Sequence, residues 1–452
     1  MSEKRETFSS PLAIFFATLG SAVGLGNIWK FPYMVGANGG GAFLIVYIIC
    51  ILLVGLPIMI SEFFIGKSTR KSPILAFKQL SEKYTFVGYL YLAATYLVLF
   101  FYSCVAGWVF LYVFKSITFQ FKNLTVATSS DIFSNVTIGP FTPVIWQLIA
   151  ILVVGFIISS GVKSGIEKMT KNLMPVLAVL LVVVAIRGLT LDGALEGLKF
   201  LFYPDFSKLT SQGVLAALGL AFFKLSVAMG ALITYASYFT EDVNMIKTGV
   251  SVAISDTVIS LLAGIAIFPA VFTFGLNPSE GAGLLFITIP LVFSKMPFGQ
   301  ILLIAFFILV AIAATGAMLS LMEVTVASLM DIKKFSRRKS VIISGSIIFI
   351  FGLLATLSYN PDGLLGHIKD PITGSNIFNM YDKISSNILM PLGGLSTAII
   401  SGYLINKDIM YSEISNEGKL KIHNVYSIYR VVLRYITPIL VAIVLITSLG
   451  IF

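Results

Sequence analysis

Residues 19–27 read Leu-Gly-Ser-Ala-Val-Gly-Leu-Gly-Asn, in the middle of an apolar run that covers residues 11–35. Three of these residues are glycines, and each glycine inside a helix costs up to about 1 kcal/mol relative to alanine. A run of this length can cross a membrane as a helix, and unwound backbone at membrane depth is tolerated only where it lines a cavity. The stretch predicts a membrane helix that is broken at a binding site, although dense glycines also allow helices simply to pack closely.

A second interruption, Lys-Leu-Ser-Val-Ala-Met-Gly at residues 224–230, lies in the apolar run 213–240. The two interruptions fall in the first and the sixth apolar runs, and broken helices at corresponding places indicate two inverted five-helix repeats. Free N–H groups and carbonyls at such breaks suit a zwitterion and a cation. The pattern favours a transporter over a channel or a receptor.

The composition supports a membrane protein. Of the 452 residues, 57% are hydrophobic and 12% are charged, whereas a soluble domain is near half apolar and about a quarter charged. An ordinary soluble enzyme, a disordered chain and a disulfide-rich secreted protein are therefore excluded. Eleven apolar runs of spanning length fall near residues 11–35, 42–65, 85–114, 141–160, 173–191, 213–240, 248–275, 298–330, 341–358, 384–405 and 431–451.

These runs predict an all-α polytopic membrane protein with eleven transmembrane helices. We expect a single transmembrane domain over residues 1–452, with broken helices 1 and 6. Its first repeat covers about 11–191, its second about 213–405, and an extra helix about 431–451.

The net charge of +10 is explained by the lysines and arginines of the loops on one side of the predicted membrane. With the N-terminus inside, the cytoplasmic loops hold 20 lysines and arginines and the opposite loops hold 8, as the positive-inside rule predicts. Nucleic acid is therefore dropped as a partner. We expect a multi-pass protein of the inner (plasma) membrane with a cytoplasmic N-terminus and Phe452 outside.

Longer motifs carry a resemblance to a known family. GSAVGLGNIWKFPY at 20–33, NGGGAF at 38–43, ITYASY at 233–238 and SSNILMPLGGL at 385–395 resemble segments of the neurotransmitter:sodium symporter family, to which the bacterial leucine transporter LeuT belongs. The match covers nearly the whole chain and preserves the order of the spans. The resemblance implies the LeuT fold and alternating-access transport of a small molecule, and no enzymatic activity.

The resemblance also implies a substrate site. In this family the substrate carboxylate meets the break in helix 1 and a tyrosine of helix 3, here Tyr102. Monoamine transporters carry an aspartate at the position of Gly24, so the glycine favours an amino acid over an amine. The implied site comprises Ala22, Gly24, Leu25, Gly26, Val98, Tyr102, Phe223, Ser226, Met229, Ala317 and Leu321. Its largely apolar side-chain half favours a hydrophobic or aromatic amino acid.

The resemblance further implies that both sodium sites of the family are altered in this chain. The first keeps Ala22 and Asn27, but Lys224 and Asp256 replace a threonine and an asparagine. The second lacks both of the hydroxyls that the family supplies from helix 8, unless Thr315 restores one of them. Its implied members are Gly20, Val23, Ala313, Gly316 and Ala317. We therefore expect at most one well-formed sodium site, the second one, and no other cofactor.

The chloride site of animal members is altered as well. Tyr47 and Ser260 remain, but Leu220 replaces a glutamine and Lys224 a threonine. We expect no dependence on chloride.

Lys224 and Asp256 lie at similar depth in the predicted membrane. A rise of 1.5 Å per residue places them about 16 Å and about 19 Å from the outer surface. A buried lysine needs a carboxylate partner. Two hypotheses follow: a purely structural ion pair, or a lysine ammonium that occupies the first sodium site. Glu62, another acid at membrane depth, is assigned a structural role against the break in helix 6.

The resemblance finally implies two gates. Lys30 and Asp382 match the outer ion pair and Arg5 and Asp331 the inner one, while Phe8 and Tyr238 match the rings that support the inner gate. Isolated surface charges remain the alternative.

The function predicted from the sequence is secondary active import of a neutral, hydrophobic or aromatic amino acid, with family-type sodium symport through altered ion sites. The partners are then the amino acid, a coupling cation and the lipid bilayer. Proton-coupled or sodium-independent transport through Lys224 is the first alternative. An amino-acid-binding membrane sensor is the second.

Overall fold

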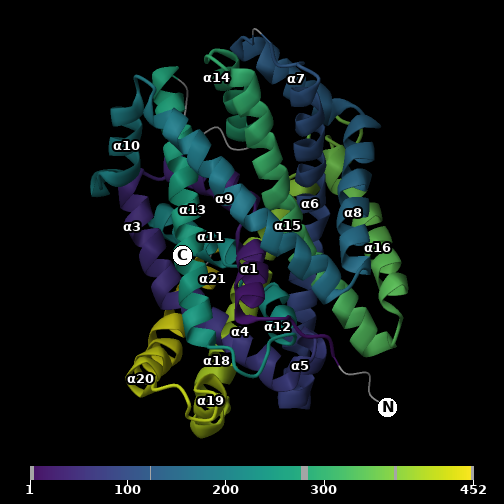
Figure 1. Cartoon of the computed structure of the whole chain (residues 1–452), viewed down its shortest axis with the longest axis vertical. Helices are drawn as coiled ribbons and strands as arrows, with labels where there is room; N and C mark the ends of the chain where they lie inside the picture. The colour runs from purple at the N-terminus through teal and green to yellow at the C-terminus, as the bar shows by residue number, and fades with distance from the viewer. Residues whose placement is uncertain (1–4, 123, 276–282, 371–373, 449–452) are drawn as a thin grey trace.

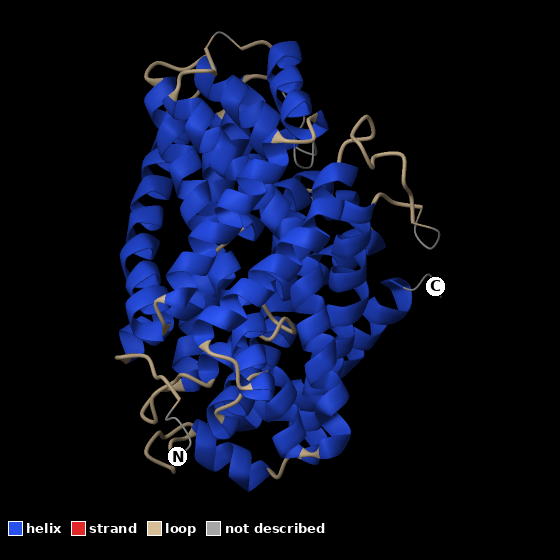
Figure 2. Cartoon of the chain, turned by 90° about the vertical axis from the view of Figure 1, so that its right-hand side faces the viewer, coloured by secondary structure: helices blue, strands red, loops and turns tan. Residues whose placement is uncertain are grey.

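The computed structural model describes residues 5–122, 124–275, 283–370 and 374–448. Within these ranges the regular structure is helical, apart from one isolated bridge between Gly40 and Pro204. Figures 1 and 2 show most helices running roughly along the long axis of the molecule. The all-helical prediction is therefore confirmed.

Nine of the described helices are long and apolar enough to cross a membrane, and a bent pair makes a tenth. The nine are Gly41–Thr69 (α3, η2 and α4), Glu82–Ile117 (η3 and α6), Thr142–Ser159 (α8), Val162–Leu189 (η4 and α9), Met245–Thr273 (α13), Gly299–Lys333 (α15), Arg337–Ser358 (α16), Ile377–Leu404 (α17, η7, α18 and η8) and His423–Ser448 (α20, η9 and α21). Shorter helices connect them: α5 (Pro73–Leu80), α7 (Val126–Ile138), α10 (Ala194–Phe202), η5 (Phe206–Lys208), η6 (Leu284–Thr288), α14 (Ile289–Ser294) and α19 (Lys407–Ile414).

Several helices begin earlier than the sequence predicts: the tenth predicted span begins at Ile377 rather than 384, the last at His423 rather than 431, and the difference is largest for the fifth. The fifth span was predicted at 173–191, but its helix already begins at Val162. The early part escapes a hydropathy criterion because Lys163, Lys168 and Lys171 are exposed on it. The sixth predicted run consists of two short helices, so the total of eleven crossings stays a prediction. The end of the last predicted span, 449–451, lies outside the described residues.

The first predicted helix is broken as its glycines indicate. Helix α1 (Pro11–Ala22) is capped by the Ser10 side chain, which accepts the Ala13 N–H, and it ends where Val23 turns to an extended conformation. Helices η1 (Gly26–Lys30) and α2 (Phe31–Ala37) continue the chain at an angle of 52° to α1. At the turn the N–H groups of Gly24 and Leu25 leave the helical hydrogen-bond ladder and donate to side chains, those of Asn27 and Tyr102.

The second break separates α11 (Ser211–Lys224) from α12 (Ala231–Ala236). Ser226, Ala228 and Gly230 all adopt left-handed φ values, of 52°, 60° and 76°. Non-glycine residues seldom adopt this conformation, so the surroundings must hold it. The Glu62 carboxylate does so in part by accepting the Ala228 N–H at 2.7 Å, as its predicted structural role requires.

The two breaks lie in the middle of the bundle. Helix α1 contacts α9, α13 and α15, and α6 packs along α15; Figure 1 shows α1 at the centre of the view, between these helices. The polar backbone at the breaks is therefore surrounded by helices, as burial in a membrane demands.

Gly230→Ala is expected to lower the thermal unfolding midpoint. Its φ of +76° is left-handed, and an added Cβ would lie 2.8 Å from Pro73 Cγ and 3.0 Å from Val324 Cγ1. A left-handed conformation alone costs a non-glycine residue roughly 1–2 kcal/mol. Gly219→Ala in α11 is the control, because, apart from its chain neighbours and the backbone of its own helix, no described atom lies within 4 Å of the added Cβ. Equal midpoints for the two variants would contradict the need for glycine at the break.

Candidate functional site

The break in α1 lies directly against α6 and α15. The Leu25 N–H donates to the Tyr102 hydroxyl at 3.1 Å. A Cβ on Gly24 would lie 2.9 Å from both Tyr102 Oη and Ala317 Cβ, so only glycine fits without displacing them. The Leu25 N–H and the Tyr102 hydroxyl, which here bind each other, are a suitable pair for a carboxylate, because both groups can donate to an anion placed between them.

The other residues implied for the substrate site are buried, apart from the half-buried Phe223, and several of them contact the two breaks. Gly26 faces the Phe223 ring, which an added Cβ would meet at 3.4 Å. The Ser226 hydroxyl donates to the Ser21 carbonyl at 2.7 Å, which ties the two breaks together. The Thr95 hydroxyl donates to the Met229 carbonyl. The remaining members of the set are buried: Ala22, Val98, Ala317 and Leu321.

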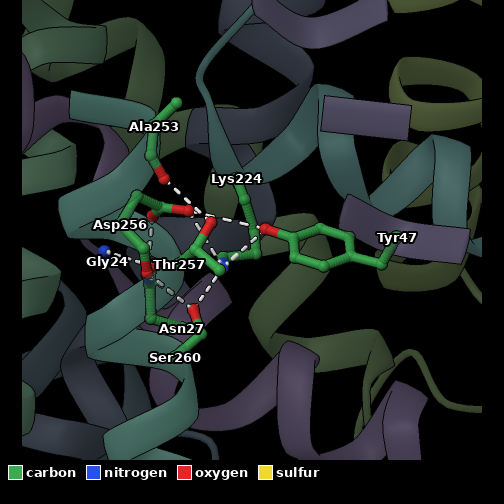
Figure 3. A network of polar contacts seen from close by, with 8 residues as sticks. All are labelled: Gly24, Asn27, Tyr47, Lys224, Ala253, Asp256, Thr257 and Ser260. Carbon is green, nitrogen blue, oxygen red and sulfur yellow. Dashed lines mark hydrogen bonds and ion pairs between the residues drawn. The ribbon is translucent and has the colours of Figure 1, made fainter. Parts of the chain in front are cut away.

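A buried ion pair lies beside the break in α1 (Figure 3). Lys224 Nζ is 3.0 Å from Asp256 Oδ2, and both side chains are 0% exposed. The ammonium also donates to the Tyr47 hydroxyl at 2.8 Å and to the Ser260 hydroxyl. Three acceptors therefore surround the charge, which is what a buried ammonium needs. Tyr47 and Ser260, which the resemblance assigns to a chloride site, face a cation here.

Asn27 connects this ion pair to the break. Its side-chain amide donates to Asp256 Oδ1 at 2.6 Å and to Ser260 Oγ at 3.0 Å. Its Oδ1 accepts the Gly24 N–H at 3.1 Å. The partners fix the orientation of the amide, because a carboxylate can only accept and an N–H can only donate. The oxygen of Asn27 thus faces the backbone of the break, and its amide group faces Asp256.

The second implied ion position lies where α1 meets α15. Gly20 and Gly316 approach each other closely: a Cβ on Gly316 would lie 2.9 Å from the Gly20 carbonyl oxygen. Ala313 and Ala317 are buried on the same helix, and Val23 is buried at the end of α1. The Thr315 hydroxyl donates within its own helix to the Ala311 carbonyl at 2.7 Å.

Both implied gate pairs are formed. Lys30 Nζ is 3.3 Å from Asp382 Oδ1, and lies 4.2 Å from the centre of the Phe223 ring. Arg5 binds both oxygens of Asp331, at 2.8 and 2.9 Å. Burial disfavours the charge on Arg5, but the neighbouring Tyr238, Asp331 and Glu323 together outweigh this effect, so the pKa of Arg5 is raised above its ordinary value.

The inner pair belongs to a larger contact made by residues 5–9. Phe8 packs edge-on against Tyr238 and Tyr235, and its N–H donates to the Tyr238 carbonyl at 2.9 Å. The Ser9 N–H donates to Glu167 at 2.9 Å, and Glu6 accepts the Val162 N–H at 2.6 Å. The N-terminal segment is therefore fixed to α15, to the end of the α12 region and to the start of the helix Val162–Leu189.

Sequence reasoning missed one ion pair near this segment. Arg337 Nη2 is 2.6 Å from Glu323 Oε2, and the other oxygen of Glu323 accepts the Tyr238 hydroxyl at 2.7 Å. Arg337 was counted only as a loop charge. The sequence signal that could have indicated this pair is Glu323 itself, because a buried acid requires a cation. The helix that follows α15, α16, begins with Arg337. Among the described residues no cluster of histidine, cysteine and acidic side chains could hold a metal ion.

The fold and the two broken helices define a multi-pass membrane transporter. The model of the sodium:neurotransmitter symporter family matches residues 5–135 and 134–452. The chain belongs to this family, and its members are transporters rather than enzymes.

Individual relatives agree with this assignment. An uncharacterised sodium-dependent transporter YhdH of Bacillus subtilis is 35% identical, covering 100% of this chain and 99% of its own length. An uncharacterised sodium-dependent transporter of Haemophilus influenzae is 34% identical, over 99% of each chain. The crystal structure of MhsT in complex with L-phenylalanine is 41% identical with a TM-score of 0.92, covering 98% of this chain and 100% of that chain. The predicted LeuT-type fold and the family resemblance are thereby confirmed.

Asp256→Asn alone is expected to destabilise the protein, because it leaves the Lys224 ammonium buried without a counter-charge. Removing one partner of a buried pair costs about 3–5 kcal/mol. Adding Lys224→Thr removes the orphaned charge, so the double variant should recover most of the loss. Thermal unfolding of the wild type, both single variants and the double variant measures this coupling. Additive losses would show that the two charges do not stabilise each other.

Proposed function

We propose that this protein transports a neutral L-amino acid with a hydrophobic or aromatic side chain by alternating access. The observation that carries the proposal is the break in α1, where the Leu25 N–H and the Tyr102 hydroxyl meet beside Gly24. This arrangement suits the carboxylate of the substrate, and Gly24 contributes no acid that would repel it. The relative MhsT, which was crystallised with L-phenylalanine, supports an amino acid of this kind.

The side-chain half of the site supports an apolar substrate. Val98, Met229 and Leu321 are buried and carry no charge. The nearest cation of the outer gate, Lys30, is already paired with Asp382 and lies over the Phe223 ring. A charged substrate side chain would therefore meet no unpaired partner among these residues and would lose its hydration.

Lys224 takes the place of the first sodium ion in this proposal. Its ammonium has three acceptors around it, and Asn27 presents its amide group rather than its oxygen to Asp256. A sodium ion about 4 Å from the ammonium would be repelled by roughly 4 kcal/mol at an effective dielectric of 20. Asp256 can compensate one positive charge but not two. The fixed ammonium therefore excludes the mobile ion.

Two other functions are distinguished by experiment. In the first, a proton moves through Lys224 and drives the transport. In the second, the protein binds an amino acid as a sensor without translocating it. Two formed ion pairs, Lys30–Asp382 and Arg5–Asp331, support transport, because a sensor needs only one gate.

The orientation and the internal symmetry belong to the same proposal. The distribution of positive charges supports a cytoplasmic N-terminus in the inner membrane, with the C-terminus outside. Breaks in the first and sixth predicted spans support two inverted repeats, about 11–191 and 213–405, followed by the extra helix.

Uptake into proteoliposomes tests the substrate class. Labelled L-phenylalanine, competed by each of the common amino acids, should be displaced best by neutral apolar ones. Tyr102→Phe removes one donor to the carboxylate, and a hydrogen bond to a charged group contributes about 1.5–3 kcal/mol, so its affinity should fall about tenfold or more. Preference for a lysine, arginine, aspartate or glutamate competitor would refute the proposed pocket. Binding without uptake would favour the sensor.

The role of Lys224 is tested by the ion dependence of the same uptake. In the wild type we expect little change when sodium is replaced by choline. The double variant Lys224→Thr with Asp256→Asn restores the residues of the family and should gain sodium dependence. A wild-type rate that rises steeply with two sodium ions would refute the role of Lys224. Uptake that follows an imposed pH gradient would identify the proton-coupled alternative.

A further inference from the structure

The second ion position of the family lacks side-chain ligands in this chain. A hard cation is held by several oxygen atoms. Gly316 and Ala317 carry no side-chain oxygen. Thr315 is adjacent, but its hydroxyl donates to the Ala311 carbonyl of its own helix at 2.7 Å, which is a common arrangement for a helical threonine. Only the carbonyls of Gly20, Val23 and Ala313 remain of the implied ligand set.

The space at this position is closed as well. A Cβ on Gly316 would lie 2.9 Å from the Gly20 carbonyl oxygen and 3.3 Å from Met174 Cε. The backbones of α1 and α15 are therefore nearly in contact, and a methionine methyl from α9 lies beside them. The carbonyl of Gly20 approaches the place where a serine or threonine side chain at 316 would begin.

A second methyl group covers the contact from α9. A Cβ on Gly20 would lie 3.0 Å from Thr170 Cγ2 and 3.7 Å from Met174 Cε. The Thr170 hydroxyl donates to the Ile166 carbonyl at 3.0 Å, so the methyl faces the glycine. Thr170 and Met174 are both buried. Methyl groups cannot coordinate a cation, whereas they pack well against glycine backbones.

We infer that the second position binds no sodium, and that α1 closes on α15 through the direct contact of Gly20 with Gly316, covered by Thr170 and Met174. Direct packing, rather than a bound ion, thus holds α1 against α15. The inference rests on the proposed function only in assuming that α1 moves relative to α15 during transport.

Binding of radioactive sodium to the purified full-length protein in a choline background tests this inference. The wild type should show no saturable binding. The double variant Lys224→Thr with Asp256→Asn restores only the first position, so it should bind at most one sodium ion per chain. Two ions per chain in this variant would overturn the inference.

If the wild type does bind sodium, two variants show which of the two positions holds the ion. If Asn27→Ala abolishes it and Gly316→Ala does not, the ion lies at the first position; the proposed role of Lys224 then fails and the closed second position stands. If Gly316→Ala abolishes it and Asn27→Ala does not, the ion lies at the second position and this inference is wrong.

The packing itself is tested by Gly316→Ala against a matched control, Gly345→Ala. The Cβ added at 345 also meets a methionine methyl, Met322 Cε, but at 3.6 Å, and it meets Ile151 Cγ2 at 3.5 Å. Gly316→Ala should lower the thermal unfolding midpoint and the uptake rate, and sodium should restore neither. Gly345→Ala should leave both unchanged. A Gly316→Ala variant as stable and active as Gly345→Ala, or one rescued by sodium, would overturn the inference.

Discussion

Unwound backbone in the middle of a membrane protein must find partners inside the protein, because lipid offers none. The two breaks of this chain are arranged around that requirement. Glu62 binds the Ala228 N–H, Asn27 binds the Gly24 N–H, and the Tyr102 hydroxyl accepts from Leu25. The same groups give the site its chemistry, since polar backbone held open by side chains can bind a polar substrate.

The buried charges follow from the same requirement. Lys224 is the last residue of α11, at one end of a break, and a charge there needs a counter-charge and several hydrogen bonds. Asp256, Tyr47 and Ser260 supply them. Because Asn27 joins Asp256 to the Gly24 N–H, the ion pair and the proposed carboxylate site form one hydrogen-bonded unit. A change at Lys224 is therefore expected to reach the substrate site through Asn27.

Much of this architecture could be predicted from the sequence. The breaks were indicated by the three glycines of residues 19–27 and by the Lys-Leu-Ser-Val-Ala-Met-Gly interruption at 224–230, and helical rise alone placed Lys224 and Asp256 at similar depth. The pairing of Arg337 with Glu323 was missed, because contacts between neighbouring helices depend on how each helix is rotated about its axis. The start of the helix at Val162 was missed, because exposed lysines lower its hydropathy. The closeness of Gly20 and Gly316 depends on differences of a few tenths of an ångström in the distance between two helices, and a sequence pattern does not contain this information.

The covalent attachment of the Lys224 ammonium has an energetic consequence. An ion that crosses the membrane with a substrate contributes about 2.3 kcal/mol for each 100 mV of membrane potential, in addition to its own concentration gradient. A lysine side chain stays with the protein and returns unchanged, so it contributes neither. In such a transporter the cation stabilises the structure at that position, but it supplies no free energy to drive the uptake of substrate. It would then accumulate its substrate only by drawing on another gradient, such as that of a second amino acid exchanged in the opposite direction.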